Sequence, residues 1–272
     1  MRDRTWEARD IADEIAAARA TGGRLSPFTG RFADFDLDGA YRVAGILACQ
    51  RAARSPVVGR KIGFTNRATW EGAGLTQPVW GSMFEETVIR TGDDSGFPIL
   101  PMAGSVEPKI ECEVVLALAS EPPAGGRGAE VARHVAEAGL GFEVVDSPYP
   151  RWKMRPADAV ATGGIHHALA VGPLVPAEDP EELTERLAGL RVAMTRDGVH
   201  AADGAGSLVM GNPLDALGAL AGLAAAAGNP LRTGEIVTTG TLTPPLYCAR
   251  GEVWQADAEG GALPAASVVL VP

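Results

Sequence analysis

The chain has 272 residues, of which 46% are hydrophobic and 21% charged, and a formal net charge of −10 at pH 7. This length and apolar content predict a globular protein with a sizeable core. The acidic balance, with no run of Lys or Arg, disfavours a nucleic-acid partner. The cysteines Cys49, Cys112 and Cys248 share no ligand spacing, so neither a disulfide framework nor a zinc site is expected.

The N-terminal segment is charged from its second residue and lacks the apolar stretch of a secretory signal. No apolar run is expected to reach the ~18 residues that a membrane span needs. We therefore expect a soluble, cytoplasmic protein without a membrane partner.

Two helices are predicted near the N-terminus. Apolar residues recur at helical spacing over residues 5–20, and Gly22 and Gly23 follow. A second helical pattern covers about residues 36–54 and is followed by Pro56. This part of the chain is expected to form a small α-rich region.

The rest of the chain is predicted to be rich in strands. β-rich segments separated by Gly and Pro cover residues 57–66, 74–89, 110–119, 190–199, 234–242, 251–257 and 266–271. Helices are predicted at 128–138 and at 212–227, the second with Asn212 as N-cap and Pro213 in its first turn. Many strands and few helices, without strict alternation, indicate an α+β fold.

Two glutamates interrupt the strand pattern "PKIECEVVLALA" of residues 108–119. Successive side chains of a strand point to opposite faces, so Glu111 and Glu113 share one face. Dry carboxylates without a partner are costly, so a cation or a basic side chain is expected between them. A solvated edge strand or salt bridges with Lys109 and arginines would also explain the pair.

A third acid, Glu143, lies in the apolar segment "GFEVVD". Three carboxylates held in strands would form a hard-oxygen site suited to Mg²⁺ or Mn²⁺, with positions left for water and substrate.

Several segments together resemble the 2-keto-4-pentenoate hydratase and oxalocrotonate decarboxylase family of the fumarylacetoacetate hydrolase superfamily. In chain order they are "GRKIGFTNRA", "QPVWGSMFE", "PKIECEVVLAL", "GFEVVDSPYPRWKMRPADAVATGG", "GNPLDALGALA" and "LRTGEIVTTGTLTPPLYCARGEVWQAD". The resemblance spans about residues 40–270. It implies a fumarylacetoacetate hydrolase-like mixed β-roll catalytic domain at 86–272, after a smaller α-rich region at 1–85, in a homo-oligomer.

The resemblance also implies the roles of individual residues. It implies that Glu111, Glu113 and Glu143 bind the divalent metal and that Lys61 lies beside it. We expect Lys61, Glu113 and His166 to take part in catalysis, although Lys61 could be a surface lysine and His166 a structural residue. The expected substrate contacts are Thr65, Trp80, Lys153, Thr239, Gly240 and Thr241. Further candidates are Glu85, Glu86, Asp158 and His167.

The resemblance implies a lyase acting on a small 2-oxo acid, a 2-hydroxydienoate or an unsaturated 2-oxo acid, by dienolate stabilisation on the metal. Hydration is the first expectation. Val79 and Trp80 stand where many hydratases of the family carry an aspartate, and this favours a 4-oxalocrotonate-type decarboxylase. A hydrolase of acylpyruvates, a biosynthetic cyclase and a non-catalytic partner of a related lyase are further alternatives.

Overall fold

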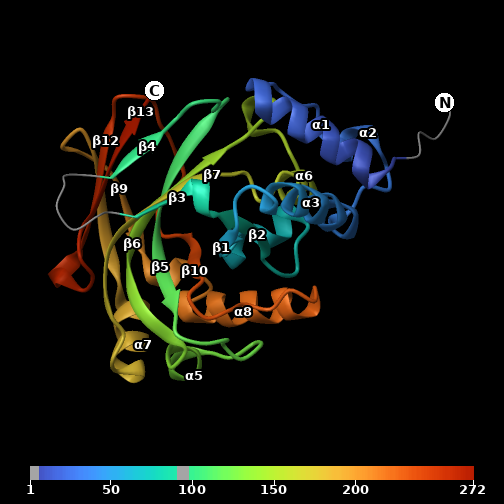
Figure 1. The fold of residues 1–272 in the computed structure, drawn as a ribbon. Coiled ribbons are helices and arrows are strands. Elements are labelled where there is room, and N and C mark those ends of the chain that lie inside the picture. Colours follow the sequence, from blue (N-terminus) through green and yellow to red (C-terminus); the bar gives the residue numbers. More distant parts are fainter. Residues whose placement is uncertain (1–5, 91–97) are drawn as a thin grey trace.

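The computed structural model describes residues 6–90 and 98–272. Three helices near the N-terminus lie together at one side of the molecule (Figure 1): α1 (Ala8–Thr21), α2 (Phe28–Arg31) and α3 (Leu37–Ala52). Helix α1 ends at Gly22, whose φ of 63° is left-handed, and the Asp36 side chain caps α3 by accepting from Gly39 N. Both predicted N-terminal helices are thus confirmed, although Thr5, where the first was expected to start, lies outside the described residues.

A large mixed sheet carries the centre of the fold, in the order β2-β1-β10-β5-β6-β7-β3, with β11 paired to β5. The β1–β10 and β3–β7 pairs are parallel and the others antiparallel. Its strands are β1 (Val57–Gly63), β2 (Val79–Phe84), β3 (Val88–Arg90), β5 (Pro108–Leu118), β6 (Val135–Asp146), β7 (His166–Pro176), β10 (Ile236–Thr241) and β11 (Leu246–Tyr247).

A second sheet of five strands has the order β4-β13-β12-β8-β9. Its strands are β4 (Ile99–Pro101), β8 (Arg191–Arg196), β9 (Val199–Ala205), β12 (Val253–Ala258) and β13 (Ala266–Val271). The remaining helices are α4 (Trp70–Ala73), α5 (Gly128–Ala132), α6 (Pro156–Ala161), α7 (Pro180–Gly189) and α8 (Pro213–Ala226), together with five 3₁₀ turns among the described residues.

The two faces of β5 have different surroundings. Cys112 and Val114 face the main core, which also contains Trp254 of the second sheet. The opposite face carries Glu111 and Glu113, and beyond them Val115. Val115 belongs to a separate apolar cluster, here called the inner plug, which consists of Met83, Val115, Leu169, Val171 and Ile236. Four different strands supply these side chains, so the large sheet curls around the plug.

One predicted helix is wrong in its extent. The helix expected at 128–138 ends at Ala132, and β6 begins at Val135. Strand β6 pairs with β5 from Leu118↔Val135 to Pro108↔Asp146, and this long-range ladder outweighs local helical spacing. Strand β7 and helices α6 and α7 were not predicted. The boundary at residue 85 stays a prediction, although β1 and β2 before it pair within the large sheet.

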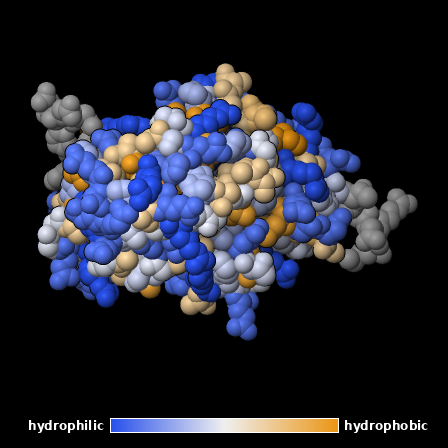
Figure 2. Space-filling model, turned by 90° about the horizontal axis from the view of Figure 1, so that it is seen from below, coloured by the Kyte–Doolittle hydropathy of each residue, from blue (hydrophilic) through white to orange (hydrophobic). Residues whose placement is uncertain are grey.

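Helix α8 begins as predicted, because the Asn212 side chain accepts a hydrogen bond from Leu214 N at 3.0 Å. The segment Gly206–Ala226 has 21 residues and a mean hydropathy of 1.4, so by length and composition alone it could cross a membrane. The sequence analysis expected no apolar run of that length. However, 56% of that apolar window is buried inside the protein, as in a core helix. The face seen in Figure 2 intersperses hydrophilic and hydrophobic residues.

Candidate metal centre and active site

Three glutamates converge on the inner face of the large sheet. Glu111 and Glu113 lie on β5, and Glu143 lies on β6 directly opposite Glu111. One carboxylate oxygen from each lies within 4.8 Å of the others. Glu113 and Glu143 are buried and Glu111 is partly exposed. The donor set is therefore all carboxylate oxygen, which fits a hard divalent cation such as Mg²⁺ or Mn²⁺.

Two basic side chains hold Glu143 from either side. Lys61 Nζ of β1 donates to Glu143 Oε2 at 2.8 Å, and His166 Nδ1 of β7 lies 2.7 Å from Glu143 Oε1. All three residues are buried. His166 Nε2 lies 3.1 Å from the hydroxyl of Thr87, so a continuous polar chain runs from Lys61 through Glu143 and His166 to Thr87.

The three glutamates of the cluster differ in the direction of their pKa shifts. Burial raises the pKa of Glu111 to about 7 and, together with the carboxylates of Glu143 and Glu111, raises that of Glu113 well above its usual value. Burial would also raise the pKa of Glu143, but Lys61 and His166 outweigh it and lower that pKa. The pKa of Glu143 is thus lowered and the pKa values of the β5 pair are raised, so a bound cation would favour the ionised form of that pair.

The same electrostatics act on the two bases. Burial would lower the pKa of Lys61, but the carboxylates of Glu143, Glu111 and Glu113 outweigh it and raise that pKa. Burial lowers the pKa of His166 despite its hydrogen bond to Glu143. Lys61 is therefore the permanent positive charge of the cluster.

An irregularity within β10, where its pairing with β5 shifts between Thr238 and Thr241, fixes the orientation of Glu113. Gly240 N donates to Glu113 Oε2 at 2.8 Å, and no hydrogen bond from another described residue engages the second carboxylate oxygen. Gly240 has a φ of 101°, and a Cβ there would lie only 2.0 Å from Thr65 Oγ1. Glycine is thus required for the close approach of Thr65, which is itself buried.

A cleft of about 1370 Å³ opens onto the cluster. The predicted site residues that line it are Lys61, Thr65, Trp80, Glu111, Glu113, Gly240 and Thr241. Glu143 and His166 lie buried behind its wall. Thr239 is buried and donates to Val114 O at 3.3 Å, and Lys153 is exposed outside the lining residues, so their substrate contacts stay predictions.

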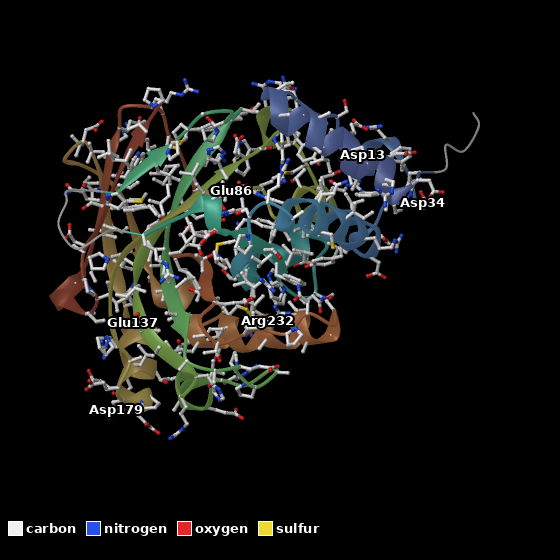
Figure 3. All side chains as sticks on the ribbon, in the orientation of Figure 1. Asp13, Asp34, Glu86, Glu137, Asp179 and Arg232 are labelled. Carbon is white, nitrogen blue, oxygen red and sulfur yellow. The ribbon has the colours of Figure 1, made fainter. Side chains whose placement is uncertain are left out.

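The other candidates lie apart from the carboxylate cluster. His167 Nε2 lies 3.2 Å from Pro101 O, and Glu86 pairs with Arg51 at 2.6 Å; Glu86 is labelled in Figure 3. Glu85 is exposed. Asp158 is buried and accepts from the backbone and hydroxyl of Thr29, so it joins α2 to α6.

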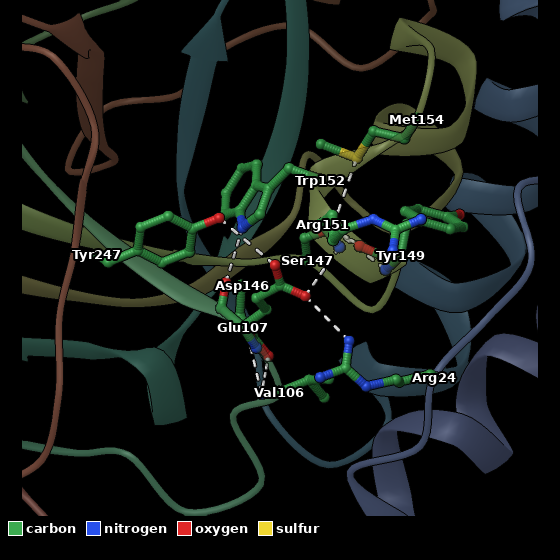
Figure 4. A network of polar contacts seen from close by, with 10 residues as sticks. All are labelled: Arg24, Val106, Glu107, Asp146, Ser147, Tyr149, Arg151, Trp152, Met154 and Tyr247. Atoms are coloured by element: carbon green, nitrogen blue, oxygen red, sulfur yellow. Dashed lines mark hydrogen bonds and ion pairs between the residues drawn. The ribbon is translucent and has the colours of Figure 1, made fainter.

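Three residues near the site were not identified from the sequence: Thr87, Trp152 and Arg155. Trp152 and Arg155 line the cleft. Trp152 Nε1 donates to Glu107 O at 3.0 Å, within the polar network shown in Figure 4. For Trp152 and Arg155 the sequence signal was their position in "PYPRWKMRP", after the glutamate strand, and that signal does not identify a contact.

Comparisons with known proteins agree with the geometry. The family model "Fumarylacetoacetate (FAA) hydrolase C-terminal" matches residues 62–268. The "TodF product hydratase" of Pseudomonas putida is 31% identical over 263 residues, which cover 94% of this chain and 93% of that protein. A "2-keto-4-pentenoate hydratase" of Burkholderia vietnamiensis is 29% identical, over 92% of this chain and 93% of its own. The predicted family resemblance is confirmed.

Solved structures give the same fold. A 4-oxalocrotonate decarboxylase from Pseudomonas putida G7, complexed with magnesium and adipate, superposes with a TM-score of 0.85 and 25% identity, over 98% of this chain and 100% of that chain. A fumarylpyruvate hydrolase from Pseudomonas aeruginosa, in complex with Mn²⁺ and pyruvate, shares the fold with a TM-score of 0.58 at 18% identity, over 80% of this chain and 89% of that chain. The α+β, β-roll fold class is confirmed.

Proposed function

The chain belongs to the fumarylacetoacetate hydrolase family, and from this premise we propose that it is a metal-dependent lyase. Its substrate is an unsaturated 2-oxo acid or the corresponding 2-hydroxydienoate, and its reaction is the addition of water to the conjugated alkene. The observation that carries the proposal is the convergence of Glu111, Glu113 and Glu143, with Lys61 beside them, at the wall of one cleft.

Glu111, Glu113 and Glu143 are the residues that would hold Mg²⁺ or Mn²⁺. A bound cation would supply a Lewis acid that stabilises negative charge developing on the keto oxygen. The relatives named as hydratases and the neighbour complexed with magnesium support this assignment.

The chain itself supplies the charge and the proton path. Lys61 faces the cleft as a cation, so it binds the negative charge of the substrate carboxylate or transfers a proton near it. Glu143 accepts from Lys61 Nζ and so orients it, in addition to serving as a metal ligand. His166 contacts Glu143 and is a positioning residue in this proposal. Glu113 offers one oxygen toward the cleft, because Gly240 N engages the other.

A second candidate is decarboxylation of a vinylogous β-keto acid. Val79 is buried and lines the cleft beside Trp80, so this point of the wall carries no acid that could activate water. The decarboxylase structure with a TM-score of 0.85 also supports it. We place the protein in the cytoplasm as a homo-oligomer, with a complex with a related lyase as an alternative.

The test uses the purified full chain, stripped of metal and then supplied with Mg²⁺ or Mn²⁺. 2-Hydroxypenta-2,4-dienoate and 2-oxo-3-hexenedioate are offered separately, and the ultraviolet absorbance and CO₂ release are followed. Loss of absorbance without CO₂ supports the hydratase, and loss with CO₂ supports the decarboxylase. Silence with both substrates, while metal still binds, would overturn the lyase proposal in favour of a cyclase or a partner subunit.

Two variants separate the ligand role from general effects of charge. Glu111→Gln should weaken metal binding and remove activity, because it takes one charged oxygen out of the cluster. Glu137→Gln is the matched control, because Glu137 is an exposed glutamate on β6, the strand paired with β5 (Figure 3). Equal metal affinity in the two variants would contradict the assignment of Glu111.

A further inference from the structure

The cleft is larger and more apolar than a five-carbon acid requires. Its volume of about 1370 Å³ exceeds the ~300–1,000 Å³ of typical small-molecule pockets, so space is left beyond the carboxylate cluster. The apolar side chains that line it include Phe64, Trp80, Trp152, Met154, Ile165 and Leu208. Leu208 is 46% exposed, so part of this surface is open to solvent.

The charges that line the rest of the cleft are mainly negative. Outside the carboxylate cluster and Lys61, the charged lining residues are Asp36, Asp38, Glu71 and Arg155. Asp36 caps α3, whereas Asp38 and Glu71 form no ion pair with any residue that the structure describes. A second carboxylate on the substrate would meet three acids, against the guanidinium of Arg155 and the ammonium of Lys109 beside Trp152. The acids outnumber the cations, so the balance favours an uncharged tail.

Three of the apolar lining residues have a strained backbone. Phe64, Trp152 and Ile165 have φ values of 56°, 56° and 54°, in the left-handed region that bulky residues rarely adopt. Such conformations persist only where the surrounding structure imposes them, and they gather at functional sites. The surrounding structure therefore imposes the backbone conformation of these three wall residues.

A polar network imposes the position of Trp152 (Figure 4). Its indole Nε1 donates to Glu107 O at 3.0 Å, and the Glu107 carboxylate accepts from Arg151 N at 3.1 Å and pairs with Arg24 at 2.9 Å. The hydroxyl of Tyr247 donates to the same carboxylate at 3.4 Å. Trp152 is thus fixed by the residues before it and across from it.

Lys109 links this indole to the carboxylate cluster. Its Nζ lies 4.4 Å from the centre of the Trp152 ring and 4.8 Å from that of Tyr247. Lys109 lies two residues before Glu111 and on the same face of β5, so their Cα atoms are roughly 7 Å apart. The Trp152 ring therefore lies on the outer side of the cluster, where the part of a substrate distal to its 2-oxo acid would extend.

We propose that the outer cleft is a subsite for an uncharged apolar or aromatic tail on the 2-oxo acid, and that Trp152 determines specificity for that tail. This inference rests on the proposed lyase function and names its substrate class. The 2-oxo acid lies at the carboxylate cluster, and its tail packs against Trp152 and the apolar wall.

The test compares three substrates that differ only in the tail: 2-oxo-3-hexenoate, 6-phenyl-2-oxo-3-hexenoate and 2-oxo-3-hexenedioate. With the Mg²⁺-loaded full chain, kcat/KM for the phenyl compound should exceed that for the hexenoate by about tenfold or more, as expected when a hydrophobic pocket is filled. Trp152→Ala should lower the ratio of the two kcat/KM values by a similar factor, and Trp152→Phe should retain most of it. Val199→Ala, on an exposed apolar residue of β9, should leave the ratio unchanged.

A second variant covers the case in which Trp152→Ala does not fold. Leu208→Asp places a charge on a residue that is already 46% exposed, and it should also lower the phenyl preference. In wild type, phenylpyruvate should bind the Mg²⁺-loaded protein more tightly than pyruvate, measured by calorimetry.

The outcomes separate this inference from the proposed function. Equal kcat/KM for the phenyl compound and the hexenoate, or a preference for the hexenedioate, would overturn the tail subsite while leaving the lyase in place. Failure to turn over any of the three compounds, with no Mg²⁺-dependent binding of pyruvate, would overturn the lyase proposal itself.

Discussion

Removal of Lys61 should destabilise the metal-free protein and increase its response to metal. In Lys61→Met, Glu143 loses the cation that lies 2.8 Å from its Oε2, in a place where Lys61 is only 5% exposed. Breaking a buried ion pair by removing one partner costs about 3–5 kcal/mol. At roughly 2 °C per kcal/mol for a chain of this size, Tm should fall by about 6–10 °C.

A divalent cation should reverse part of that loss, because it brings positive charge back to the three carboxylates. Metal at 100 times its Kd stabilises the native state by about 2.7 kcal/mol. Removing the like charge of Lys61 should tighten metal binding, so at equal Mg²⁺ the Tm of the variant should rise by more than that of wild type.

The assay is thermal unfolding of both proteins, followed by tryptophan fluorescence, after EDTA treatment and again over a Mg²⁺ titration. Lys153→Met is the matched control, since Lys153 is exposed and should change stability by no more than about 0.5 kcal/mol. A metal-free Tm equal to that of wild type, or a smaller response to Mg²⁺ in Lys61→Met, would refute this account of the cluster.

Three further predictions concern the pH dependence of metal binding, the glycine at position 240 and the cap of α8. Burial raises the pKa of Glu111 to about 7, so its carboxyl holds a proton below that pH. Mg²⁺ has to displace this proton, so Mg²⁺ affinity should rise as the pH increases through 7. Calorimetry in buffers of different ionisation enthalpy would detect the released proton. Gly240→Ala should lower the free energy of unfolding by about 1–3 kcal/mol from backbone strain, and by more from the contact of its Cβ with Thr65 at 2.0 Å; urea unfolding would measure it. Asn212→Ala should cost about 1 kcal/mol in the same assay, because Leu214 N loses its cap; no change would contradict the capping role.

Local rules predicted part of this site well. The period of two in a strand placed Glu111 and Glu113 on one face, and the Asn-Pro pair at Asn212 predicted the start of α8. The position of Glu143 opposite Glu111 depends on the β5–β6 register, which no single segment encodes. The hydrogen bond from Gly240 to Glu113 likewise depends on how distant strands meet.

The errors have the same origin. Residues 135–138 continue a helical pattern locally, yet they form the start of β6, because pairing with β5 satisfies their backbone over a long ladder. Trp152 was missed because its left-handed backbone is not signalled by its residue type; Glu107 and Lys109, which hold it, come from a segment over 40 positions away.

The inner plug limits how substrate and product can reach the carboxylate cluster. Its five side chains are at most 2% exposed, and Val115 lies next to Glu113 on the same face of β5. Gly141 allows Val115 to pack closely against β6, since a Cβ at position 141 would lie only 2.6 Å from Val115 Cγ2. None of the five plug side chains lines the cleft, so the carboxylate cluster is approached from the cleft and not through the plug. Because a hydration product occupies the same cleft as the substrate, it has to leave before the next substrate molecule can bind.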